Sequence, residues 1–292
     1  MLAAPTVGLN KKRALKVLDE LEPFSPIAGR LLSTLSTDPD TISMSHVGDL
    51  IERDTILAGK ILSLANSALY NRGVEVVSIH RAIAALGLNK IRNTVLALSV
   101  NRVWRKAKTP VYWSMVRFNL HSLASAVAAD LLATRTKTNY PEGAFVSGLF
   151  HDIGRLVMAV MLQSEYEPFC NASEDNHPRV RNCERDMLGF DHCELSADIL
   201  AHWKLPREIQ TAVGLHECPE MDDTVVGDSE FPLSMVIHTA DKYAMSVGAS
   251  IYDTHPSPEQ ADPLQLLGTS DEEGKFFPEF KSQFDLIRSF MN

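Results

Sequence analysis

The segment Gly148-Leu149-Phe150-His151-Asp152-Ile153-Gly154-Arg155 places an adjacent histidine and aspartate inside an otherwise apolar stretch of helical character. Burying such a pair costs free energy unless hydrogen bonds or a cation satisfy its polar atoms. A divalent metal ion does so efficiently, because imidazole nitrogen and carboxylate oxygen are both good ligands for zinc, iron and manganese. The alternative is that His151 and Asp152 satisfy only each other and nearby backbone groups. The dipeptide by itself favours that simpler arrangement.

The rest of the chain repeats its apolar residues at helical spacing, as in Leu31, Leu32 and Leu35, and alternating strand patterns are nearly absent. Pro206 follows Leu205 and is expected in the first turn of a helix. Other start and stop signals are Ser25 before Pro26, Asp54 before Thr55, and Ser78 opening a helix that Gly87 closes. The pattern predicts an all-α fold of roughly a dozen helices with short connections.

Changes in composition divide the chain into four expected parts. Residues 1–17 form an N-terminal extension, and 18–110 form an N-terminal helical subdomain that ends in a long helix over 88–103. A charged, proline-containing break at 106–110 leads into a second helical subdomain, 111–248, which contains most of the histidines. Residues 249–292 form a C-terminal tail whose amphipathic segment 276–290 predicts a terminal helix. The acidic stretch 220–230 is expected to be a surface loop.

Composition and charge exclude several classes of protein. With 292 residues, 45% of them hydrophobic, the chain is long enough to bury a core. Its net charge of -9 disfavours binding to nucleic acid, and the short basic runs at 11–13 and 102–108 are expected to be solvated helix faces. The cysteines form no C-x-x-C pair, residues 1–9 do not resemble a signal peptide, and no apolar stretch approaches the ~20 residues of a membrane span. These features indicate a cytoplasmic protein that does not enter a membrane.

Further residues of metal-binding type occur on either side of the His-Asp pair. His121 lies one predicted helix earlier, and Asp191-His192, His216-Glu217 and then His238 with Asp241 follow it. His238 and Asp241 are three residues apart and would share one helix face. Because the chain has ten histidines, several of them without any pattern, spacing alone leaves a metal site and a plain polar cluster equally open.

The order of four of these residues resembles that of a known superfamily. His121, then His151-Asp152, then Asp241 match the H…HD…D pattern of the HD-domain metal-dependent phosphohydrolases. In that superfamily the four side chains bind a catalytic metal ion, and the resemblance implies the same role for these four positions. It also implies an HD-domain-like helical bundle for residues 111–248.

A second resemblance begins in the N-terminal subdomain. The segments that carry it are Leu64-Ala65-Asn66-Ser67-Ala68-Leu69-Tyr70, Ser78-Ile79, Ala82-Ile83-Ala84-Ala85-Leu86-Gly87, Leu188-Gly189-Phe190-Asp191-His192 and Trp203-Lys204-Leu205-Pro206. Together they look like the signature of the HDOD (HD-related output domain) family, and the similarity covers roughly residues 18–247. Membership implies a helical bacterial protein that serves as an output or scaffolding module in signal transduction.

The resemblance extends to a second metal ion. His192 and His216 match positions that bring a second ion into the HD-GYP branch of phosphodiesterases. One or two ions are therefore implied, with iron, manganese, zinc and nickel as candidates. Three departures disfavour cyclic dinucleotide hydrolysis: Glu217 replaces a histidine, no Gly-Tyr-Pro follows Cys218, and Arg155 replaces a lysine. Glu217 would still be able to bind a metal ion or to hydrogen-bond one of its waters.

Three functions are compatible with these residues. In an interaction module, which we favour, the metal or polar network is structural and the N-terminal subdomain binds an unknown signalling protein. In a phosphohydrolase, the metal would lower the pKa of a bound water and Asp152 would bridge two ions. Arg155 would neutralise the phosphate there, unless it is only solvated or salt-bridged. In a sensor, a phosphate-containing ligand would bind the same cleft. The amphipathic C-terminal segment is compatible with a homodimer.

Overall fold

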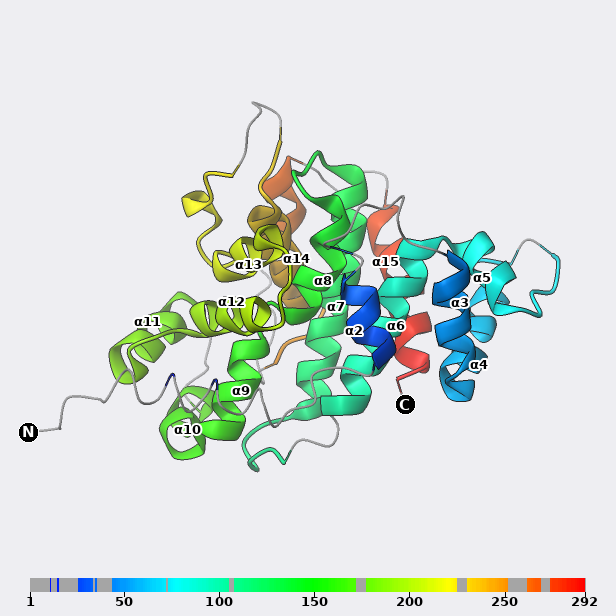
Figure 1. Cartoon of the computed structure of the whole chain (residues 1–292). Helices are drawn as coiled ribbons and strands as arrows, with labels where there is room; N and C mark the ends of the chain where they lie inside the picture. The colour runs from blue at the N-terminus through cyan, green and yellow to red at the C-terminus, as the bar shows by residue number, and fades with distance from the viewer. Residues whose placement is uncertain are drawn as a thin grey trace, which may run out of the picture. The chain divides into compact units, whose positions relative to one another are not determined.

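The computed structural model describes residues 11, 15, 26–33, 35, 44–71, 73–104, 108–171, 177–224, 230–251, 262–268 and 274–291 (Figure 1). Within these ranges the regular structure is helical, and the only β-type pairing is an isolated bridge between Thr138 and Phe231. The predicted all-α fold is therefore confirmed. Apart from Lys11 and Leu15, the predicted N-terminal extension lies outside the described residues. Residues 252–261 of the tail also lie outside them.

Two compact units make up the fold. The smaller unit comprises Pro23–Trp104 and Gly274–Asn292, and the larger unit comprises Arg105–Glu273 with Met1–Glu22. The helices of the smaller unit are α2 (Pro26–Ser33), α3 (Met44–Glu52), α4 (Thr55–Ala65), α5 (Ile79–Leu86), α6 (Leu88–Trp104) and α15 (Phe276–Ser289). The predicted terminal helix is thus present, and it joins the unit formed by the N-terminal helices.

Local hydrogen bonds explain where the helices of the smaller unit begin and end. Oδ1 of Asp54 accepts a hydrogen bond from the backbone N–H of Leu57 at 3.0 Å, which caps α4. Ser78 caps α5 in the same way. Gly87 ends α5 with a φ of 81°, a backbone conformation that favours glycine. These predicted caps are confirmed, as is the long helix that became α6.

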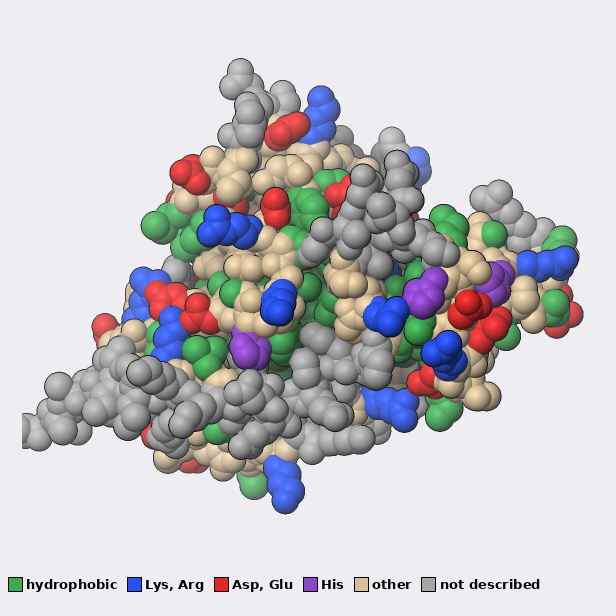
Figure 2. Space-filling view, viewed as in Figure 1, with side chains coloured by type: hydrophobic (Ala, Val, Ile, Leu, Met, Phe, Trp, Pro, Cys, Tyr) green, Lys and Arg blue, Asp and Glu red, His purple; other side chains and the backbone are tan. Residues whose placement is uncertain are grey.

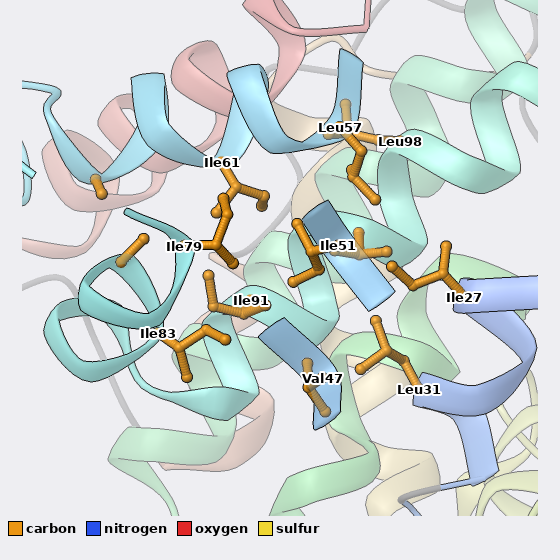
Figure 3. Packing of buried hydrophobic residues seen from close by; sticks show 13 residues of the cluster. Ile27, Leu31, Val47, Ile51, Leu57, Ile61, Ile79, Ile83, Ile91 and Leu98 are labelled. Carbon is orange, nitrogen blue, oxygen red and sulfur yellow. The ribbon is translucent and has the colours of Figure 1, made fainter. Parts of the chain in front are cut away.

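The core of the smaller unit is rich in isoleucine, and Figure 3 shows these side chains gathered between the helices. Ile51, Ile61 and Ile91 are completely buried. The C-terminal end of the chain is tied to α6, because Nδ2 of Asn101 donates a hydrogen bond to the carbonyl of Met291 at 2.7 Å. Burial of aliphatic side chains is the main favourable term in the stability of such a unit.

Ile61→Val is expected to lower the free energy of unfolding by about 1 kcal/mol, because the lost methyl group leaves a small cavity in a packed core. Ile56→Val on the same helix is the control, since Ile56 is 65% exposed. The control is expected to change stability by less than about 0.5 kcal/mol. Denaturant unfolding of both variants measures the difference. Equal effects would contradict the assignment of Ile61 to the buried face of α4 and of Ile56 to its exposed face.

The larger unit contains most of the histidine-bearing helices. They are α7 (Met115–Arg135), η3 (Pro141–Gly143), α8 (Ala144–Phe150), α9 (Ile153–Met161), α10 (Gln163–Asn171), α11 (His177–Leu188), α12 (His192–His202), α13 (Arg207–Gly214), η4 (Pro219–Met221), α14 (Leu233–Ser246) and η5 (Pro263–Leu267). Helices α7, α8 and α14 pack on one another, and α12 packs on α9 and α13. Small residues permit this approach: a Cβ added at Gly148 would lie 2.7 Å from the carbonyl oxygen of Ser125.

Two local expectations for this unit are corrected. His151 and Asp152 do not lie within one continuous helix but at a turn between α8 and α9, where Asp152 has a φ of -104° and a ψ of 14°. Pro206 precedes α13 instead of lying in its first turn. Its ψ of 148° is extended, so that its carbonyl can accept the first hydrogen bond of the helix, from Gln210.

The expectation that no stretch reaches the length of a membrane span is also wrong. Pro141–Met161 is long and apolar enough to cross a membrane by length and composition. In the structure this segment is η3, α8 and α9, and nearly all of it is buried inside the folded unit. Its apolar character is therefore accounted for by packing in the protein core.

Charged side chains of both signs are interspersed over the face shown in Figure 2. The predicted loop at 220–230 contributes to the surface, since Glu220, Asp223 and Glu230 are exposed, although its start is the short helix η4. Residues 225–229 of this loop lie outside the described residues. The mixture of charges is that of an ordinary solvated surface.

Candidate metal centre

The side chains predicted to bind metal converge within the larger unit. His121 lies on α7, His151 and Asp152 at the α8–α9 turn, His192 at the start of α12, His216 after α13, and Asp241 on α14. None of them is more than 2% exposed. Residues far apart in the chain thus form one buried polar cluster.

We call His121, His151, Asp152 and Asp241 the first donor set. Nε2 of His121 lies 3.1 Å from Nε2 of His151 and 3.2 Å from Oδ1 of Asp241. It lies 3.6 Å from Oδ2 of Asp152. Nε2 of His151 is 3.5 Å from the same oxygen of Asp152 and 3.6 Å from that of Asp241. Ligand atoms of His121, His151 and Asp152 thus lie within 4.8 Å of one another, and Oδ1 of Asp241 lies beside both imidazoles.

Hydrogen bonds fix which nitrogen of each imidazole carries the proton. Nδ1 of His121 lies 2.8 Å from the carbonyl oxygen of Ala249, and Nδ1 of His151 lies 2.8 Å from that of Gly148. Since a carbonyl oxygen only accepts, both Nδ1 atoms donate, and both Nε2 atoms carry lone pairs when the rings are neutral. When both rings are neutral, neither Nε2 can donate to Oδ1 of Asp241, which is buried. A cluster made only of acceptors needs a cation, either a metal ion or an added proton.

In the absence of a metal ion, a proton on His121 supplies that charge. Burial lowers the pKa of His121, but the carboxylates of Asp152 and Asp241 outweigh burial and raise the pKa to about 10. Burial raises the pKa of Asp241, but the neighbouring imidazoles of His121 and His151 hold that pKa well below its usual range. The first donor set therefore stabilises positive charge between two carboxylates.

A second donor set comprises His192, Cys193, His216 and Glu217. One potential ligand atom from each side chain lies within 4.8 Å of the others. Nε2 of His192 is 3.2 Å from Oε1 of Glu217 and 3.3 Å from Sγ of Cys193. Burial, together with the neighbouring His151, lowers the pKa of His216 to about 3, so this imidazole is neutral at pH 7. The two sets meet at Asp152, because Nε2 of His216 lies 3.8 Å from its Oδ1.

Arg155 on α9 is completely buried beside the second donor set. Its Nε donates to Oδ1 of Asp152 at 2.9 Å. Its Nη2 donates to Nε2 of His192 at 2.9 Å and to Oε1 of Glu217 at 3.0 Å, while Nη1 lies 3.7 Å from Oε1 of Glu184. Burial raises the pKa of Asp152, but Arg155 and then His151 hold it well below its usual value. Of the alternatives considered for Arg155, the structure shows the salt-bridged one.

A family model for the HDOD domain matches residues 21–219 of the chain. The chain belongs to the HDOD family. The matched range includes five of the six predicted metal ligands of this HDOD protein, and Asp241 lies beyond it.

Three solved structures are similar to this HDOD protein. An HDOD domain protein of unknown function from Geobacter sulfurreducens has a TM-score of 0.69 at 22% identity, with 98% of each chain covered. A "Putative phosphohydrolase" from Shewanella amazonensis SB2B has a TM-score of 0.69 at 22% identity, covering 96% of this chain and 98% of the other. A "Putative signal transduction protein" from Marinobacter aquaeolei VT8 has a TM-score of 0.67 at 19% identity, covering 100% and 67%. No curated protein matches the chain. The likeness to these structures supports the fold.

Sequence reasoning missed two residues of the HDOD site. Cys193 directly follows His192, and adjacency to a predicted ligand was the available signal. Glu184 on α11 is completely buried, and its Oε2 accepts from the backbone N–H of His192 at 2.9 Å and from Nδ1 at 2.6 Å. His238, in contrast, lies outside both donor sets, and its Nδ1 donates to the carbonyl of His216 at 2.7 Å.

Gly154→Ala is expected to destabilise the HDOD fold by about 3 kcal/mol, the upper end of the usual range for overpacking. A Cβ at Gly154 would lie 2.3 Å from the carbonyl oxygen of His192 and 2.9 Å from Oγ of Ser196, so α9 and α12 would have to separate. Gly59→Ala is the control, because nothing lies within 4 Å of its Cβ position. Denaturant unfolding should show the control to be neutral or slightly stabilising. A tolerated Gly154→Ala would contradict the close approach of the two helices.

Proposed function

We propose that this HDOD protein is a regulatory module of bacterial signal transduction in which one divalent metal ion, bound by the first donor set, holds the larger unit in a fixed arrangement. The observation that carries the proposal is the acceptor-only geometry of that set. Its residues come from α7, the α8–α9 turn and α14, so a shared ion would link elements that are distant in the chain. Such binding supplies folding free energy and requires no turnover. The partner of the module would be another signalling protein.

Donor chemistry limits the choice of metal. Two imidazole nitrogens and two carboxylate oxygens suit iron, manganese, zinc or nickel. Calcium and magnesium prefer sites made of oxygen ligands alone. The hydrogen bonds from Nδ1 of His121 and His151 to backbone carbonyls orient both rings, as is typical of histidines that bind metal.

Burial and charge pairing favour a structural role over catalysis. Each member of the first donor set is at most 2% exposed. A phosphohydrolase needs room for water and phosphate beside the ion, and a cation that is available to the phosphate. The guanidinium of Arg155 already pairs with Asp152, Glu184 and Glu217, so binding phosphate would require these contacts to break.

Metal-dependent phosphohydrolysis is the second candidate. It is favoured by the match of the four donors to the catalytic set of the HD superfamily, and by Lys242, whose side chain is partly exposed and whose Nζ lies 4.0 Å from Oδ2 of Asp241. A bound ion would supply Lewis acidity and a lowered pKa of water. In this reading Lys242, and not Arg155, would contact the phosphate.

Metal analysis combined with a turnover assay tests the proposal. The purified full chain is expected to contain about one ion per chain, and removal of that ion by a chelator is expected to lower the melting temperature. Incubation with bis(p-nitrophenyl) phosphate and manganese or iron should give no hydrolysis above that of His151→Ala. Hydrolysis abolished by both His151→Ala and Asp152→Ala would establish the phosphohydrolase instead. A chain that binds none of the candidate metals would overturn both functions.

A further inference from the structure

The second donor set has the chemistry of a metal site. It offers two imidazoles, a thiol and a carboxylate whose ligand atoms lie within 4.8 Å of one another, and His192, Cys193 and His216 are buried. Nδ1 of His216 donates to the carbonyl of Val213 at 2.7 Å, so its Nε2 carries a lone pair. Nitrogen and sulfur donors in this combination are typical of zinc sites.

A cation of the protein itself already occupies this set. Nη2 of Arg155 lies 2.9 Å from Nε2 of His192 and 3.0 Å from Oε1 of Glu217, two acceptors that are only 3.2 Å apart. Nε of the same guanidinium donates a hydrogen bond to Oδ1 of Asp152 at 2.9 Å. A metal ion would need the same lone pairs, so the guanidinium and an ion cannot both be bound there.

Charge balance leads to the same conclusion. Arg155 is surrounded by the carboxylates of Asp152, Glu184 and Glu217, and its side chain is completely buried. Since a guanidinium stays protonated in proteins, its positive charge is permanent. Removing it leaves buried carboxylates that need a replacement cation.

We propose that Arg155 acts as a built-in substitute for a second metal ion, and that removal of its guanidinium turns His192, Cys193, His216 and Glu217 into a metal-binding site. The native chain then holds one ion, at the first donor set, a count that rests on the proposed function. Asp152 lies between the two cations, with Oδ2 toward the first donor set and Oδ1 toward Arg155.

Metal counts on the full chain test this inference. Each protein is stripped with a chelator, dialysed against zinc and analysed for metal. Wild type is expected to hold about one ion per chain and Arg155→Ala about two. Arg155→Lys is the matched control, since it retains a positive charge on a flexible side chain, and it is expected to stay near one. Two ions in wild type, or no gain in folded Arg155→Ala, would overturn the inference. Wild type without an ion and Arg155→Ala with one would refute the proposed function and leave the inference standing.

Cobalt provides a readout of the ligands at the second donor set. Cobalt-loaded Arg155→Ala is expected to show the near-ultraviolet charge-transfer absorption of a cobalt–thiolate bond, which wild type lacks. The double variant Arg155→Ala, Cys193→Ser should lose that absorption. A second ion without it would overturn the assigned donor set.

His216→Gln keeps the inference testable if Arg155→Ala does not fold. Because His216 belongs to the set that Arg155 fills, the single ion of the native chain is expected to stay bound in this variant. Loss of that ion would place it at the second donor set and overturn the inference.

Discussion

Asp152→Ala is expected to lower the free energy of unfolding by about 3–5 kcal/mol, because it leaves the buried charge of Arg155 short of a partner. Nε of Arg155 donates to Oδ1 of Asp152 at 2.9 Å, and neither side chain is more than 1% exposed. Asp152 also supplies Oδ2 to the first donor set, at 3.5 Å from His151 and 3.6 Å from His121. The same variant is therefore expected to lose the bound ion, measured by elemental analysis beside denaturant unfolding.

Two further variants separate the contributions to this effect. Asp152→Asn retains a side-chain oxygen that can accept from Arg155, and its amide nitrogen can donate to the imidazoles. This variant should lose the bound ion, but with a smaller loss of stability than Asp152→Ala. Asp198→Ala on α12 removes a carboxylate that is 40% exposed and pairs with Lys11 at 2.7 Å, and is expected to cost less than about 1 kcal/mol. An Asp152→Ala protein with wild-type metal content would refute the role of Asp152 in the first donor set.

Short-range signals made the helices of the smaller unit predictable. The caps at Asp54 and Ser78 act through hydrogen bonds to residues three positions ahead. These hydrogen bonds are local and form independently of the rest of the fold. The turn at His151-Asp152 had no such signal, because apolar helical sequence continues on both sides of it. The packing of α8 on α7 and of α9 on α12 determines where that turn lies.

The candidate site depended on long-range information that a single sequence carries only weakly. Spacing left the histidine cluster undecided, and resemblance to the HD superfamily selected His121 and Asp241 as partners of the His-Asp pair. Glu184 could not be selected in this way, because it lies in a strongly charged helix that predicts a solvated face, yet it is completely buried. The ion pair of Arg155 had one local signal, its spacing of three residues from Asp152 on the chain.

The metal-free protein is expected to be most stable near pH 6.5. The pKa of His121 is raised from 6.5 to about 10 in the folded state, since the carboxylates of Asp152 and Asp241 outweigh burial. Its contribution to stability is therefore complete below pH 6.5 and is lost as the pH rises toward 10. Because one pKa unit corresponds to about 1.4 kcal/mol, the loss is on the order of several kcal/mol. Denaturant unfolding of chelator-treated protein from pH 6.5 to 9 measures it.

On the acid side the sign reverses. Burial, together with His151, lowers the pKa of His216 to about 3 in the folded state. Below pH 6.5 the unfolded chain therefore binds a proton at His216 that the folded chain does not bind, and stability falls as the pH falls. Asp152 and Asp241, whose pKa values lie well below 3.8, add to the loss of stability as the pH falls below that value.

A bound metal ion should remove the part of the alkaline loss that comes from His121. The ion takes the place of the proton between His121, Asp152 and Asp241, so the loaded protein no longer depends on a proton that is lost as the pH rises. Binding then releases that proton, and apparent affinity should increase by up to about tenfold per pH unit between pH 6.5 and 9. His121→Gln is the control, since it removes the part of the alkaline loss that His121 contributes, together with the proton release. A metal-free protein whose stability stays constant or rises over this range would show that no added proton lies between the two carboxylates, leaving the acceptor cluster without the cation that its geometry requires.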